Sequence, residues 1–128
     1  MTTKKPYDLL GGAEGVRRLV NVFYDIVEHD PAARPLLQMH LENSGLAHAR
    51  EEQYLFLSGF LGGPQLYFEH HGHANVKLPH AHLKITAVER DVWLHCMDKA
   101  LTQMCAAAPV HAHLMTVFAR VAEALRNT

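Results

Sequence analysis

The sequence predicts an all-α domain, because apolar residues recur at helical spacing and no segment of useful length alternates as a strand would. Residues 14–29 show the spacing most clearly. Their apolar side chains lie mainly three or four positions apart: Val16, Leu19, Val20, Phe23, Ile26 and Val27. Asp30 and Pro31 end this helix and open a short turn, since Asp caps well and Pro is favoured at a first helical position.

Two further apolar patterns predict long helices. Residues 46–61 form the first, and its inner side is expected to carry Leu46, Phe56, Leu57, Phe60 and Leu61. Gly62-Gly63-Pro64 ends that helix, because glycine terminates helices and proline cannot continue them. Residues 110–126 form the last helix, with Val110, Leu114, Val117, Phe118, Val121 and Leu125 at helical spacing.

A capping signal predicts where the remaining long helix begins. Thr86 and Glu89 stand three positions apart, which is the spacing of a capping box, so the helix should start at Ala87. It should continue to about Ala107, where Pro109 interrupts the pattern.

The centre of the chain breaks the plan of a simple four-helix bundle. We expect residues 65–78 to be mostly loop, followed by a short helix near 75–82. Bundles usually connect their helices with about 2–8 residues, so a longer connection between Gly62 and Thr86 suggests that it wraps around a bound group.

Bulk composition fits a single domain spanning residues 1–128 and excludes some partners. The chain is 48% hydrophobic and 20% charged, with 12 basic and 13 acidic residues. This balance removes the electrostatic case for nucleic acid or an anionic membrane as a partner. No apolar run approaches the roughly 20 residues of a membrane span, and no signal-peptide pattern follows the basic N-terminus, so we expect a cytoplasmic protein.

The two cysteines agree with a reducing compartment. Cys96 and Cys105 fall in what reads as one helix, where nine steps of about 100° place them on opposite faces. A disulfide needs Cα atoms within about 7 Å, so these two thiols should be unpaired.

The most informative segment contains His80 and the only tryptophan, Trp93. A neutral imidazole at the end of a short helix is one way in which a protein offers an axial nitrogen to haem iron. The indole N–H and the hydroxyl of Tyr24 could donate to a ligand on the opposite face of the iron. His82 competes as the axial ligand, but two residues along a helix turn about 200°, so both imidazoles cannot face one iron.

An ordered set of residues over about 7–125 resembles the truncated haemoglobins, the short 2-over-2 globins, of group II. The residues that carry the resemblance are Leu19-Val20, Phe23-Tyr24, Phe56-Leu57, Gly62-Gly63-Pro64, Tyr67, Glu69, Gly72-His73, His80, Ile85, Glu89-Arg90-Asp91, Trp93-Leu94 and Cys96-Met97. The resemblance implies a haem b sandwiched between two antiparallel helix pairs.

The same resemblance implies roles for particular residues. His80 matches the proximal iron ligand, Tyr24 the distal tyrosine and Trp93 the tryptophan over the distal pocket. The remaining cofactor-binding residues would be His40, Gln53, Phe56, Leu57, Tyr67, Lys77, Ile85 and Met97, with Lys77 as a partner for a haem propionate.

The expected function is binding of O₂, NO or CO at a five-coordinate haem iron beneath polar donors. Such donors slow ligand release, which suits oxygen, NO or peroxide redox chemistry or sensing better than bulk transport. NO dioxygenase-like or peroxidase-like activity with an unidentified electron donor stays open, and the chain is expected to be a monomer or weak homodimer.

A histidine cluster supports an alternative, a non-haem metal-binding protein that uses His70–His82. His70, His71 and His73 are close in sequence, but structural zinc usually has four N or S ligands and no Cys-x-x-Cys is present. We therefore interpret this cluster as a solvated loop. A second alternative is a helical interaction module without a cofactor.

Overall fold

The computed structural model describes residues 5–73, 75, 80 and 83–127. Its helices are α1 (Pro6–Leu9), α2 (Gly12–His29), η1 (Pro31–Ala33), α3 (Arg34–Leu41), α4 (Gly45–Phe60), α5 (Leu66–His71), α7 (Ala87–Gln103) and α8 (Ala108–Leu125). The described part of the chain contains no strand, which confirms the all-α prediction.

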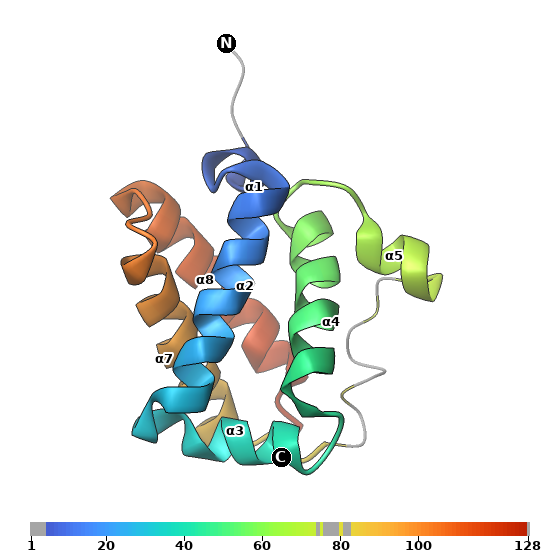
Figure 1. Ribbon diagram of the computed structural model, residues 1–128, viewed down its shortest axis with the longest axis vertical. Helices are drawn as coiled ribbons and strands as arrows, with labels where there is room; N and C mark the ends of the chain where they lie inside the picture. Colours follow the sequence, from blue (N-terminus) through green and yellow to red (C-terminus); the bar gives the residue numbers. More distant parts are fainter. Residues whose placement is uncertain (1–4, 74, 76–79, 81–82, 128) are drawn as a thin grey trace.

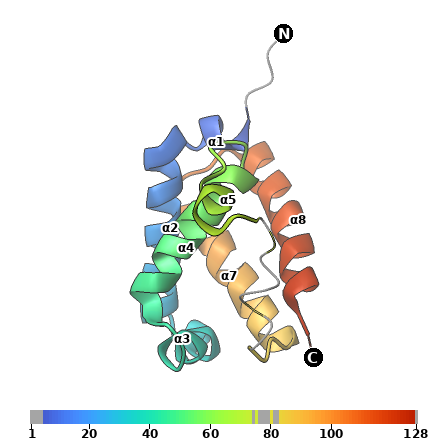
Figure 2. The same ribbon diagram turned by 90° about the vertical axis from the view of Figure 1, so that its right-hand side faces the viewer.

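The long helices form two antiparallel pairs. Helix α2 descends and α4 returns beside it, whereas α7 ascends and α8 descends (Figure 1). Contacts between α2 and α7 join the two pairs, and α3 closes one end against α4 and α7. The turned view places α5 against α4 (Figure 2).

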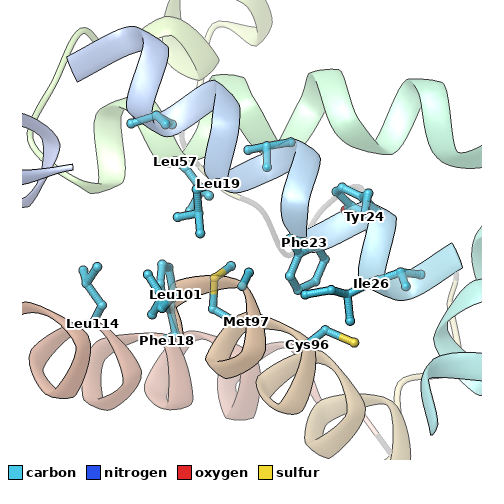
Figure 3. Close-up of a cluster of buried hydrophobic side chains, with 14 of the residues drawn as sticks. Leu19, Phe23, Tyr24, Ile26, Leu57, Cys96, Met97, Leu101, Leu114 and Phe118 are labelled. Atoms are coloured by element: carbon cyan, nitrogen blue, oxygen red, sulfur yellow. The ribbon is translucent and has the colours of Figure 1, made fainter. Parts of the chain in front are cut away.

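The core lies where α2 meets α7 and α8 (Figure 3). Every apolar residue predicted to face inward on α2 is buried: Val16, Leu19, Val20, Phe23, Ile26 and Val27. Met97 and Leu101 of α7 and Leu114 and Phe118 of α8 complete this core with no more than 1% exposure. Burial of this stripe, at roughly 25 cal/mol per Å² of apolar surface, is what holds α2 against the second pair.

The capping box predicted for α7 is present. Thr86 Oγ1 accepts a hydrogen bond from the N–H of Val88 at 3.1 Å, and the N–H of Thr86 donates to Glu89 Oε1 at 2.8 Å. These bonds satisfy backbone donors that the first helical turn would otherwise leave unpaired.

The predicted end of α7 is wrong. The helix ends at Gln103 rather than near Ala107, because Cys105 adopts a left-handed backbone conformation with φ of 56°. Pro109 then lies in the first turn of α8 instead of following α7. Cys96 and Cys105 are therefore not on one helix, although both thiols are free as predicted.

Three short helices were not expected from the sequence. Helix α1 is a single turn, and α3 buries only Leu36, so neither has a long apolar stripe from which it could be predicted. Helix α5 replaces the start of the loop predicted over 65–78, and it forms because Tyr67 packs inward. The short helix expected near 75–82 lies largely outside the described residues.

None of the described helices combines the length and the apolar character that a membrane crossing requires.

Gly15 is required where α1 turns into α2. A Cβ added at Gly15 would lie 1.7 Å from the carbonyl oxygen of Leu10 and 2.5 Å from its carbonyl carbon. Because these are backbone atoms, Gly15→Ala should lower the free energy of unfolding by about 1–3 kcal/mol or more. Urea unfolding of the variant and the parent protein measures this difference.

Gly59→Ala is the matched control for Gly15→Ala. The atoms nearest to a Cβ at Gly59, which is also helical, belong to the exposed side chain of Gln65, with Oε1 at 2.7 Å. That side chain can move, and alanine favours a helix by about 0.5–1 kcal/mol over glycine. Equal stability of the two variants would contradict the tight turn at Gly15.

Candidate functional site

A cavity of about 230 Å³ opens between the two helix pairs. Its walls come from α2, α3, α4, α5, α7, α8 and the segment that precedes α7. Most of the residues proposed from the sequence line it: Tyr24, His40, Gln53, Phe56, Leu57, Tyr67, His80, Ile85 and Trp93. The fold therefore brings together side chains that are far apart in the chain.

One of the proposed residues is placed differently, and another cannot be compared. Met97 is fully buried in the core between the helix pairs and is not among the residues that line the cavity. Lys77, proposed as a propionate partner, lies outside the described residues.

Tyr24 and Gln53 form the polar centre of the cavity. The Tyr24 hydroxyl donates to Gln53 Oε1 at 3.1 Å, so α2 and α4 are joined at this point. Burial raises the pKa of Tyr24 well above its usual value, and the nearby positive charge of Arg50 opposes this only in part. The phenol therefore stays protonated at neutral pH and acts as a donor.

The amide nitrogen of Gln53 is buried and has no hydrogen-bond partner. Leaving a buried donor unpaired costs about 1–3 kcal/mol, so natural proteins rarely do so. Because Gln53 lines the cavity, a bound group or ligand with an acceptor atom would satisfy this nitrogen.

His40 contributes a neutral imidazole beside Tyr24. The two rings meet edge to face, with centroids 5.6 Å apart. Burial, followed by the proximity of His80, lowers the pKa of His40 to about 4. His40 is therefore uncharged at pH 7 and can offer one N–H.

Aromatic side chains build much of the wall. Phe56 stacks on Phe60 at 5.3 Å, and it meets Tyr67 edge to face at 6.0 Å. Trp93 lies between Phe23 and Phe118, with ring centroids 5.3 and 5.5 Å away. Its indole is thus held in place by packing on both sides while it lines the cavity.

Several lining residues were not proposed from the sequence. Leu36 and Met39 come from α3, and Phe118, Val121 and Leu125 come from α8. The periodic pattern identified the α8 residues as inward-facing, but it does not distinguish a core contact from a cavity wall.

Arg90 also lines the cavity, where it forms ion pairs with Glu123 and Asp91. These carboxylates raise the pKa of the Arg90 guanidinium, so it stays charged.

The residues present suit a haem group. An apolar, aromatic cavity would hold the porphyrin, His80 offers an imidazole, and Tyr24 and Gln53 supply donors that a buried apolar cavity would otherwise lack. An acceptor atom on such a group or on its ligand would satisfy the unpartnered Gln53 nitrogen.

The chain matches known proteins along its length. The family model described as "Bacterial-like globin" matches residues 5–127. The group 2 truncated haemoglobin YjbI of Bacillus subtilis is 36% identical over 96 residues, covering 75% of this chain and 68% of that protein.

Solved structures of truncated haemoglobins are similar to this chain over nearly its whole length. The cold-adapted truncated haemoglobin of Pseudoalteromonas haloplanktis TAC125 superposes with a TM-score of 0.91 at 36% identity, covering 98% of this chain and 99% of that one. The group II 2-on-2 haemoglobin of Agrobacterium tumefaciens also gives 0.91, at 30% identity with 99% and 97% covered.

The fold is thus that of a 2-on-2 truncated globin, a class of haem proteins that bind diatomic ligands such as O₂. The chain belongs to the bacterial-like globins and, within them, to the group II truncated haemoglobins.

Proposed function

We propose that this protein binds haem b through the imidazole of His80 and holds O₂ or another diatomic ligand against Tyr24, Trp93 and Gln53. When bound, haem supplies an iron that takes a diatomic ligand and leaves it partly negative. The observation that carries the proposal is the buried, unpartnered amide nitrogen of Gln53 beside the protonated hydroxyl of Tyr24.

The proposed roles of the polar residues follow from their protonation. Tyr24 stays a phenol because burial raises its pKa, and neutral His40 adds no charge to the cavity. Hydrogen bonds to a charged group contribute about 1.5–3 kcal/mol each, so two or three donors would slow ligand release by several powers of ten.

The apolar residues have a different proposed role. Phe56, Leu57 and Ile85 would pack against the porphyrin and exclude water, while Trp93 is oriented by Phe23 and Phe118. Low water content strengthens every hydrogen bond in the cavity. Slow release favours oxygen, NO or peroxide chemistry, or sensing, over bulk O₂ transport.

Haem binding is tested by adding haemin to the purified protein. We expect uptake of one equivalent and a Soret band of five-coordinate haem after reduction. Carbon monoxide binding, followed by resonance Raman spectroscopy, then reports both the imidazole bond and the polarity of the ligand pocket. Failure to take up porphyrin supplied in excess would overturn the proposal.

A further inference from the structure

A second group of potential metal ligands lies outside the polar centre of the cavity. Glu52 of α4 and His70 and His71 of α5 can each offer one ligand atom, and these atoms all lie within 4.8 Å of one another. His71 Nε2 and Glu52 Oε2 form a hydrogen bond of 2.6 Å, which a bound ion would replace by moving the two atoms to about 3.4 Å apart.

Packing holds two of these three side chains in place. The His71 ring packs at a tilt against Tyr67, with centroids 4.3 Å apart, and Tyr67 is itself buried. The side chains of His71 and Glu52 are only 28% and 26% exposed. Helix α5 ends directly after His71, at Gly72 with φ of 78°, which keeps both histidines in its last turn.

His70 is exposed and is free to adjust. Its ring already meets that of His71, with centroids 4.7 Å apart. Ligand atoms bound to one ion at about 2.1 Å lie at most about 4.2 Å apart, so a modest rotation of His70 would bring the three donors within reach of one ion.

The donor set selects a class of metal. Two imidazoles and one carboxylate suit Zn²⁺, Ni²⁺ or Cu²⁺, whereas Mg²⁺ and Ca²⁺ prefer oxygen ligands. Three protein ligands leave a fourth tetrahedral position open for water.

We propose that Glu52, His70 and His71 form a divalent transition-metal site that is distinct from the site of the haem iron. Glu52 and Tyr67 also line the cavity, so the ion would sit at its edge, where α4 meets α5 (Figure 2). His73 is not part of this group, since only the ligand atoms of Glu52, His70 and His71 lie within 4.8 Å of one another, and its Nδ1 accepts the N–H of Asn75 at 3.1 Å.

Sequence spacing alone could not identify this site. The sequence offers His70, His71 and His73 without a Cys-x-x-Cys, which favours a solvated loop over a metal site. The structure instead gives a helix whose end faces a carboxylate from α4.

Titration of the haem-loaded ferrous CO protein with Zn²⁺ by calorimetry tests the proposal. We expect one ion per chain, bound more weakly towards acidic pH because imidazole must be neutral to coordinate. His70→Ala, His71→Ala and Glu52→Gln should each weaken binding by more than about tenfold, since even loss of outer-shell partners costs about 10–100-fold.

His111→Ala is the matched control. His111 Nε2 lies 2.7 Å from Asp98 Oδ1, so it forms the same kind of imidazole–carboxylate pair, but no third ligand joins it among the described residues. Its replacement should leave Zn²⁺ affinity unchanged. The proposal would be overturned if the three site variants bound Zn²⁺ as tightly as the parent protein. It would also be overturned if His111→Ala lost as much Zn²⁺ affinity as the site variants.

Nitrogen-15 NMR of the imidazoles in the same diamagnetic complex gives an independent measurement. Zn²⁺ should shift the ring nitrogens of His70 and His71 and leave those of His111 and His113 in place. Shifts spread evenly over all histidines would mean non-specific binding and would contradict the site.

Discussion

Replacing His80 by alanine should weaken haem binding more than about 100-fold relative to the parent protein. Losing an outer-shell partner of a metal ligand already costs about 10–100-fold in metal affinity, and losing the ligand itself should cost more. His80 comes from the segment before α7 and lines the cavity. The other described histidines that line it are His40, which is half-buried against Tyr24, and His48. Transfer of haem to an excess of a scavenging apoglobin measures the change.

Two comparisons make this result specific to His80. His82→Ala, the rival ligand from the sequence, should retain haem normally. His80→Gly should regain the parent absorption spectrum when free imidazole is added, because the imidazole can occupy the vacated space. An unaltered spectrum in His80→Ala would rule out His80 as the iron ligand.

Replacing Tyr24 and Trp93 together by phenylalanine should raise the O₂ dissociation rate by at least about two powers of ten. Each lost hydrogen bond to a charged ligand removes about 1.5–3 kcal/mol, and 1.36 kcal/mol is a factor of ten in rate. Phenylalanine keeps an aromatic ring next to Phe23 in both positions, so the core contacts are largely preserved. Stopped-flow displacement of O₂ by CO measures the rate.

Tyr54→Phe is the control for the loss of a tyrosine hydroxyl. Tyr54 lies on α4, and the guanidinium carbon of Arg17 lies 3.7 Å from the centroid of its ring. Tyr54 is not among the residues that line the cavity. Its replacement should leave O₂ release unchanged. The single variants matter as well, because Tyr24→Phe also frees Gln53 Oε1 and the two effects need not add. Unchanged release in the double variant would contradict the proposed donors.

Local signals in the sequence predicted most of the fold. The apolar stripe of α2 and the Thr86–Glu89 capping box act within a few residues, so spacing alone was enough to identify them. The end of α7 was misplaced because Cys105 is an unusual residue for a left-handed conformation. Helices α3 and α5 were missed because each buries a single side chain, Leu36 or Tyr67, and is stabilised by contacts with other helices.

For the candidate site, too, some features were predicted from the sequence and others were not. Resemblance to a family singled out His80, Tyr24 and Trp93, and the structure places all three around one cavity. The resemblance did not reveal that Gln53 accepts a hydrogen bond from Tyr24 while its own amide nitrogen has no partner.

Local patterns along the chain were enough to predict the helical class, the positions of the long helices and the residue types available for haem chemistry. Which of those groups meet, such as Glu52 with His71 and Tyr24 with Gln53, became clear from the packed helices alone. The physical reason is that helical periodicity and capping depend on neighbours along the chain. Hydrogen bonds and burial in a cavity depend instead on how separate helices pack.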